Sequence, residues 1–187
     1  MDIKRIYGTW NEGIVLDKHI LESKFLGYND KGKKRFENTR TELGNLVYRL
    51  KYKNDISTVK NIMNLITDIL EKWNLKEKID IVLPVPPSKT NRKYQPVFEL
   101  SKAIAKYLNK DVCLDVMINQ SKLHAKDGYK VKGKIIQTKP LKYKSNILVI
   151  DDLYSTGLTL NEVCRILRKD NNVEKIYCLV LTRTRRE

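Results

Sequence analysis

The sequence predicts an α/β fold with a mostly parallel central sheet flanked by helices and a small N-terminal subdomain that contains strands. Segments of strand length that are rich in apolar residues occur at residues 79–85, 147–150 and 176–182. The continuous apolar run at 147–150 is typical of a strand that is buried on both faces, as in a parallel sheet. Segments with apolar residues at helical spacing lie between these runs. Strands that alternate with helices favour a parallel sheet with helical connections.

The N-terminal half contains two predicted helices. Leu43, Leu46, Val47 and Leu50 lie on one side of a helix that begins at Glu42, and Thr39 or Thr41 could cap it. The next helix has seven apolar side chains at i, i+3, i+4 spacing, and Asp55 or Ser57 is its expected cap. In this half we expect strands at 13–17 and 19–26, a turn at 28–32, helices at 42–50 and 57–73, and a strand at 79–85.

In the C-terminal half, Pro96 occupies the first turn of a predicted helix, where proline is favoured. A lysine-rich segment, residues 119–146, is longer than most loops in compact domains, and such loops are commonly functional. Here we expect a helix at 96–108, strands at 112–117 and 134–138, the buried strand at 147–150, a helix after residue 159, and a last strand at 176–182.

Length and composition indicate one domain. A chain of 187 residues can bury a substantial core, and we expect residues 1–54 to form a hood or appendage on an α/β core of residues 55–187. No apolar run could span a bilayer, and the N-terminus does not resemble a signal peptide. Cys113, Cys164 and Cys178 lie in apolar segments without a Cys-x-x-Cys pair, which predicts reduced core thiols. We expect a cytoplasmic protein with no membrane partner.

The formal charge of +15 is distributed unevenly. Residues 81–187 hold 21 Lys/Arg against 10 Asp/Glu, and residues 120–144 alone hold eight lysines and one aspartate. This cluster suits a polyanion, which could be pyrophosphate, a nucleotide or nucleic acid. A lysine-rich surface that serves only solubility is an equally open interpretation.

The central feature is the stretch from Ile147 to Thr159, Ile-Leu-Val-Ile-Asp-Asp-Leu-Tyr-Ser-Thr-Gly-Leu-Thr. The acidic pair, Asp151 and Asp152, follows the buried strand, and its carboxylates can accept hydrogen bonds from ribose hydroxyls. A loop of small residues then leads into a helix, whose first N–H groups can hold a phosphate. Gly157 allows close approach of the backbone to that phosphate. The stretch predicts a site for a phosphorylated sugar.

Other interpretations of this stretch fit less well. The apolar strand and acidic pair are similar to a Walker B motif, but the one Walker A candidate, Gly128 to Ile135, has Ile where Ser or Thr must reach magnesium. In a receiver domain the acidic pair would follow the first strand. A buried strand that simply ends in solvated acids is a further alternative.

The stretch closely resembles the thirteen-residue phosphoribosyl-pyrophosphate (PRPP) motif of type I phosphoribosyltransferases. The resemblance covers about residues 42–184 and implies the type I phosphoribosyltransferase fold. It implies catalytic roles for Asp151 and Asp152, which would also meet magnesium indirectly, through water or ribose hydroxyls. It implies that PRPP is bound by Ser155, Thr156, Gly157, Leu158 and Thr159.

A second resemblance concerns Leu83-Pro-Val-Pro-Pro-Ser88, which is similar to the family's pyrophosphate-binding loop. Pro84-Val-Pro86 followed by Arg92-Lys-Tyr-Gln95 is similar to the ComF-type branch, although Lys93 replaces a glycine, one residue is missing, and the N-terminal zinc module of that branch is absent. The resemblance implies PRPP contacts at Val85, Pro86, Pro87, Ser88, Arg92 and Lys93.

In the same family a loop at the position of residues 119–146 closes over the substrate. By this resemblance Lys122 and Lys130, with Lys126 and Lys132, are candidates to neutralise the departing pyrophosphate. A nearby histidine, His124, could serve as an acid or base, although a lone loop histidine is more often uninvolved.

The implied function is transfer of a phosphoribosyl group from PRPP, with Mg²⁺, to a nitrogenous base or amine, as in nucleotide metabolism. Two alternatives stay open. One is a ComF-like protein that senses PRPP or a nucleotide without catalysis, or that associates with nucleic acid through the basic residues 120–144. The other is an interaction module with a vestigial site. A second copy of the chain, in a homodimer, is a further candidate partner.

Overall fold

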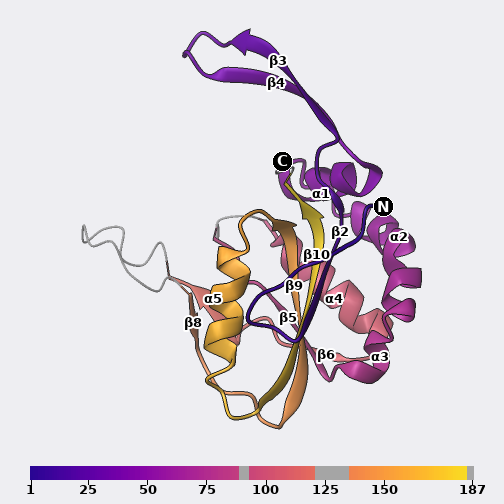
Figure 1. Cartoon of the computed structure of the whole chain (residues 1–187), viewed down its shortest axis with the longest axis vertical. Coiled ribbons are helices and arrows are strands. Elements are labelled where there is room, and N and C mark those ends of the chain that lie inside the picture. The colour runs from indigo at the N-terminus through magenta and orange to yellow at the C-terminus, as the bar shows by residue number, and fades with distance from the viewer. Residues whose placement is uncertain (89–92, 121–134, 185–187) are drawn as a thin grey trace.

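A computed structural model describes residues 1–88, 93–120 and 135–184 (Figure 1). The strands of its main sheet are β1 (Lys4–Arg5), β2 (Glu12–Lys18), β5 (Ile81–Pro84), β6 (Asp111–Val112), β9 (Ser145–Tyr154) and β10 (Val173–Arg183). Two small sheets contain β3 (Glu22–Tyr28) with β4 (Lys34–Thr39), and β7 (Met117–Asn119) with β8 (Ile135–Gln137). The helices are α1 (Glu42–Tyr52), α2 (Thr58–Lys72), α3 (Leu75–Lys78), α4 (Pro96–Leu108) and α5 (Leu158–Leu167).

The main sheet has the strand order β1-β2-β10-β9-β5-β6. Strand β1 is antiparallel to β2, and the other neighbouring strands are parallel. The predicted α/β fold with a mostly parallel central sheet is therefore confirmed.

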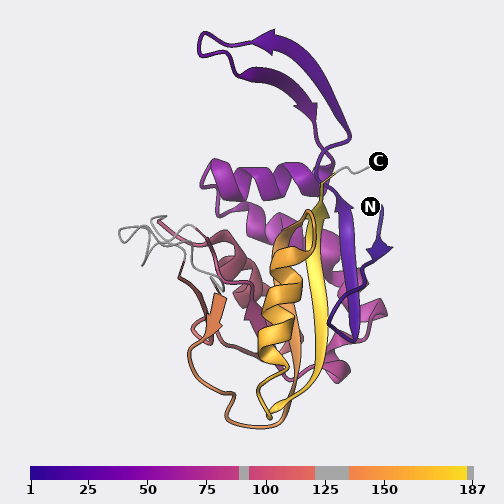
Figure 2. The same ribbon diagram turned by 60° about the vertical axis from the view of Figure 1, so that its left-hand side comes forward.

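Helices cover both faces of this sheet, and β9 shows the arrangement most clearly (Figure 2). Leu148 and Ile150 pack in the core formed with α1, α2 and α4. Ile147 and Val149, which point to the other face, pack in the core formed with α5. All four side chains are completely buried. This two-sided burial explains why the sequence is continuously apolar here rather than alternating.

One predicted strand, residues 112–117, is wrong in extent. The N–H of Cys113 still donates to Val82 O of the main sheet at 3.0 Å. The chain then leaves that sheet, and Thr138 donates to Val116 O at 2.8 Å. Two short strands, β6 and β7, therefore replace one, because the segment pairs with two different neighbours. The short strand predicted at 134–138 is confirmed as β8.

The N-terminal segment contributes to two parts of the molecule. Strand β2 lies beside β10 in the central sheet and β1 lies beside β2, so both strands are part of the central layer. Strands β3 and β4 form a separate hairpin that projects away from the rest of the molecule (Figures 1 and 2). The division at residue 54 and the hood role of residues 1–54 stay predictions.

Among the described residues, no helix has the length and apolar character needed to cross a membrane. All three cysteines are free. Cys164 and Cys178 are buried in the core on the α5 side, with their Sγ atoms 3.7 Å apart, and Cys113 is half-buried.

Helix α1 is fixed against the end of β2 by its first turn. The hydroxyl of Thr41 accepts a hydrogen bond from the N–H of Gly44 at 2.9 Å and donates to Lys18 O at 2.6 Å. Gly44 lies so close to the preceding chain that an added Cβ would be 2.3 Å from His19 O. This close approach sets the position of α1 and, through it, of Lys51 in its last turn.

Substitution of Gly44 by Ala should destabilise the protein, although Gly→Ala within a helix ordinarily stabilises by up to about 1 kcal/mol. The reason is that the new methyl group must displace a backbone carbonyl, which is not a flexible side-chain end. We expect a loss of more than about 1 kcal/mol in the free energy of unfolding, measured by urea denaturation. The control is Asn45→Ala, at an exposed position of the same helix, which should be neutral or slightly stabilising. A Gly44→Ala protein as stable as the parent would contradict the close contact.

Candidate functional site

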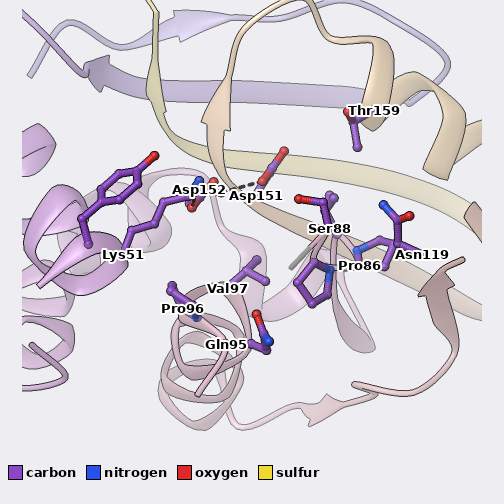
Figure 3. A pocket seen from close by; sticks show the side chains of 13 residues that line it. Lys51, Pro86, Ser88, Gln95, Pro96, Val97, Asn119, Asp151, Asp152 and Thr159 are labelled. Atoms are coloured by element: carbon purple, nitrogen blue, oxygen red, sulfur yellow. Dashed lines mark hydrogen bonds and ion pairs between the residues drawn. The ribbon is translucent and has the colours of Figure 1, made fainter. Parts of the chain in front are cut away.

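A cavity of ≈ 380 Å³ opens at the carboxyl ends of β5 and β9 (Figure 3). Ligands of open α/β sheets commonly bind at this edge, and the volume is within the usual range for small-molecule sites. The lining residues come from α1, from the loop after β5, from the start of α4, and from β7, β9 and α5. They are Lys51, Tyr52, Val85, Pro86, Pro87, Ser88, Gln95, Pro96, Val97, Asn119, Asp151, Asp152 and Thr159.

The acidic pair lies at the end of β9, and hydrogen bonds fix its backbone. The N–H of Asp152 donates to the Oδ1 atom of Asp151 at 2.8 Å. The hydroxyl of Thr182, on the neighbouring strand β10, donates to the carbonyl of Asp152 at 2.9 Å. Asp152 is buried, with 8% of its surface exposed, and Asp151 is half-buried at the cavity.

A lysine from the N-terminal half balances one of these two carboxylates. Lys51 Nζ lies 2.7 Å from Asp152 Oδ2, and three quarters of the lysine side chain is buried. Figure 3 shows the lysine reaching from the end of α1 to the acidic pair. No ion pair joins Asp151 to a cation in the part of the chain that the structure describes.

The two carboxylates therefore differ in their electrostatic surroundings. Burial, and next the negative charge of Asp152, raise the pKa of Asp151 from 3.8 to about 8. Lys51 acts in the opposite direction and only partly offsets this rise. At neutral pH Asp151 therefore favours its protonated form, and Lys51 is the counter-ion of the neighbouring carboxyl group, Asp152.

A histidine lies behind the acidic pair. His19 Nδ1 is 3.2 Å from Thr182 Oγ1. Because the Thr182 hydroxyl donates its own hydrogen to the Asp152 carbonyl, the Nδ1–H group of His19 is the donor in this contact and Thr182 Oγ1 is the acceptor. Burial, followed by the positive charge of Arg40, lowers the pKa of His19. The imidazole is therefore a neutral support for the strand end.

The proline-rich loop after β5 forms one wall of the cavity. The N–H of Val85 is occupied, because it donates to Ile150 O at 2.8 Å. Pro86 and Pro87 have no N–H. Among the described residues of the predicted pyrophosphate loop, Ser88 is thus the one that carries both a hydroxyl and an N–H for an anion.

On the far side of the acidic pair, the loop 155–157 leads into α5. Gly157 precedes the helix with φ of +75°, a conformation that favours glycine, and an added Cβ would be 2.6 Å from Tyr154 Oη. Thr159, in the first turn of α5, lines the cavity, whereas Leu158 is 73% exposed. Ser155 and Thr156 are exposed, and Thr156 Oγ1 accepts from the N–H of Leu158 at 3.3 Å.

The remaining predicted site residues lie elsewhere. Lys93 is exposed and does not line the cavity. Arg92, Lys122, Lys126, Lys130, Lys132 and His124 lie outside the described residues.

Sequence reasoning missed several cavity residues. It assigned no site role to Lys51, Tyr52, Val97 or Asn119. Pro96 was named only as the first turn of a helix, and Gln95 only as the end of the ComF-like motif. Nothing in their local sequence shows that they face residues up to a hundred positions away.

Asp151→Asn should stabilise the protein in a pH-dependent way. Between pH 3.8 and about 8 the unfolded chain has Asp151 ionised while the folded chain keeps it protonated, so stability falls as pH rises through this window. An amide avoids that cost. We expect the Tm of Asp151→Asn to exceed that of the parent by at least about 2–4 °C at pH 8, with a difference that shrinks toward pH 5. Asp152→Asn is the matched control.

The Tm of Asp152→Asn should lie below that of the parent, because removal of the Asp152 carboxylate leaves Lys51 largely buried without its ion-pair partner. The measurement is thermal unfolding of the three proteins from pH 5 to pH 9. Equal Tm values for Asp151→Asn and the parent at pH 8 would show that Asp151 ionises at no cost.

Comparisons with known proteins bear on the family and the fold of the chain. A family model described as the phosphoribosyl transferase domain matches residues 52–187. No curated protein sequence gives a significant match.

Solved structures with a similar fold include glutamine phosphoribosylpyrophosphate amidotransferase from B. subtilis, with a TM-score of 0.50 and 14% identity over 81% of this chain and 34% of that chain. A second is described as the allosteric regulatory enzyme of purine biosynthesis, with a TM-score of 0.51 and 15% identity over the same shares, 81% and 34%. Orotate phosphoribosyltransferase from Aeropyrum pernix has a TM-score of 0.48 and 16% identity over 85% and 75%. Because the family model spans well over half of the sequence, the chain belongs to the phosphoribosyltransferase domain family of the type I superfamily.

Proposed function

We propose that this protein transfers the phosphoribosyl group of PRPP to a nitrogenous base or amine and releases pyrophosphate in a Mg²⁺-dependent reaction. The observation that carries the proposal is the meeting of three features at one cavity: the acidic pair, the proline-rich loop with Ser88, and the first turn of α5 with Thr159. Each suits a different part of PRPP, namely the ribose diol, the pyrophosphate and the 5′-phosphate.

The acidic pair suits a ribose diol. Asp152, which forms an ion pair with Lys51, can accept hydrogen bonds from a hydroxyl, and Asp151 can donate its proton or accept, according to its protonation state. These contacts would hold the ribose so that its C1 atom lies over the cavity. Positioning of this kind is a large part of catalysis when bond breaking runs ahead of bond making.

The start of α5 suits the 5′-phosphate. The first N–H groups of a helix have no partner within the helix, and the positive end of the helix dipole favours an anion. Gly157, which precedes the helix with a positive φ, has no side chain at the turn. The Thr159 hydroxyl adds a donor on the cavity side.

The residues of the cavity also fit Mg²⁺. This ion prefers oxygen ligands, keeps several waters, and is commonly held by one or two carboxylates together with substrate phosphates. Asp151, which has no cationic partner among the described residues, and the Ser88 hydroxyl offer such oxygens. When bound, Mg²⁺ would neutralise charge on the departing pyrophosphate. Its arrival would also favour the ionised form of Asp151, whose pKa is otherwise raised.

The transition state of such a transfer has positive charge on the ribose ring. The carboxylate of Asp152 lies at the cavity with a single counter-ion, Lys51, and a charge placed there in advance stabilises a cationic ring without reorganisation. The protein therefore needs no covalent nucleophile for this reaction. Arg92, Lys93, Lys122 and Lys130 stay candidates for contacts with the pyrophosphate.

The first test is isothermal titration calorimetry of PRPP with Mg²⁺. We expect micromolar binding to the parent protein and loss of binding in Asp151→Asn/Asp152→Asn, because amides replace both carboxyl groups that would bind the diol. The matched control, Asp111→Asn/Asp115→Asn, removes two exposed carboxylates outside the cavity and should bind normally. Absence of binding to the parent would overturn the proposal. Binding without pyrophosphate release in the presence of any nitrogenous base would instead favour the ComF-like sensor.

A second test concerns the phosphate loop. Gly157→Ala should weaken PRPP binding by at least about tenfold, because the methyl group would meet Tyr154 and the turn would lose its favourable backbone geometry. Gly32→Ala is the control. Gly32 also has a positive φ, +67°, but an added Cβ there meets nothing within 4 Å, and it lies in the hairpin. Equal PRPP affinities of the two variants would show that the loop does not hold the phosphate.

A further inference from the structure

The β3–β4 hairpin has one aromatic face that nothing in the described structure covers. Phe25 and Phe36 are cross-strand partners, and after a bulge Tyr28 pairs with Lys34, which places the three rings on the same face. The ring centroids of Phe25 and Phe36 are 5.5 Å apart, and those of Phe25 and Tyr28 are 5.4 Å apart. The rings are 48% (Phe25), 50% (Phe36) and 63% (Tyr28) exposed.

The hairpin also carries an excess of positive charge close to these rings. Its tip, residues 30–35, reads Asp-Lys-Gly-Lys-Lys-Arg, which is four cations against one acid. Lys34 lies on the aromatic face, opposite Tyr28. The other face is charged but balanced, since Lys24 is paired across the strands with Glu37.

We infer that this hairpin binds single-stranded nucleic acid. Exposed rings on which bases stack, next to cations that track the phosphates, are the combination by which proteins bind single strands without sequence preference. A duplex fits less well, because its base faces are already stacked and unavailable to side-chain rings.

Charge favours this occupant over a second copy of the chain. The chain has a formal charge of +15, and two copies in contact through this face would each bring the same cationic tip. A polyanion would instead be attracted to the cationic tip. Because an isolated two-stranded hairpin is only marginally stable in water, a ligand that covers the rings would also stabilise it.

The inference is separate from the proposed transferase activity, because the hairpin and the PRPP cavity have no lining residue in common. It also differs from the prediction that nucleic acid binds at residues 120–144, most of which lie outside the described structure. Aromatic variants distinguish the two surfaces.

The test is fluorescence anisotropy with labelled oligo-dT and oligo-U of about 12 nucleotides, a length within the usual site size. Phe36→Ala and Tyr28→Ala should each weaken binding by about tenfold, since each removes one stacking ring. Phe36→Leu, which keeps the apolar bulk but not the ring, should weaken binding similarly, and thermal unfolding checks that each variant is folded. The controls are Tyr7→Ala and Tyr143→Ala, which remove exposed tyrosines outside the hairpin and should change nothing.

Salt dependence tests the cationic part. Lys33→Gln/Lys34→Gln should lower the slope of log K against log salt by about 1.4, the contribution of two phosphate contacts to a single strand. Lys60→Gln/Lys76→Gln, at exposed positions of α2 and α3, makes the same change in charge and should leave the slope unaltered.

Two kinds of result would overturn the inference. The first is an absence of binding at low salt. Binding that Phe36→Leu and Tyr28→Ala leave unchanged would count equally against the inference, because the nucleic acid would then contact other basic residues. The second is a dimer, found by light scattering, that Phe36→Ala converts to a monomer, because a second copy would then cover the rings.

Discussion

The site depends on one electrostatic constraint: two adjacent carboxylates lie at the end of a strand that is buried on both faces. Ionisation of both in this environment would be costly, and the structure limits the cost with a single lysine. Lys51 lies 2.7 Å from Asp152, whereas burial and the charge of Asp152 raise the pKa of Asp151 to about 8. One carboxyl group of the pair thus has a cationic partner, and the other has a raised pKa. A substrate diol and a divalent cation would supply the hydrogen bonds and the positive charge that the protein alone does not provide at this pair.

This constraint explains why the N-terminal segment is part of the site although the family model begins at residue 52. The lysine comes from α1, and α1 is held by Thr41 and Gly44 against the end of β2. Strand β2 in turn lies beside β10, whose Thr182 supports the backbone of Asp152. The N-terminal chain therefore contacts the acidic pair directly through Lys51 of α1, and it supports the pair indirectly through β2, which lies beside β10 and its Thr182. A change at either contact would alter the electrostatics of the cavity without touching its lining.

Much of this architecture could be predicted from local sequence. Continuous apolar runs located the central strands, helical spacing located α1, α2 and α4, and Pro96 marked the first residue of α4. The acidic pair, which the sequence singled out, lines the cavity, whereas Gly157 precedes α5 and does not line it. Long-range contacts could not be predicted in this way. The Lys51–Asp152 ion pair joins residues about a hundred positions apart, and a lysine at the end of a helix has no local sign of its partner. The short strands β6 and β7 were missed as separate elements because their boundary depends on a change of neighbours, which local sequence does not record.

The place of β2 in the sheet also bears on the order of folding. Its parallel partner, β10, follows about 160 residues later in the chain, and β10 is the strand that connects β2 to β9. During synthesis, β2 has no position in the sheet until residues 173–183 have left the ribosome. Until then β2 can pair with β1 but not with the rest of the sheet, and pairing over such a sequence distance is slow. The step that joins β2 to the rest of the sheet is therefore late and non-local.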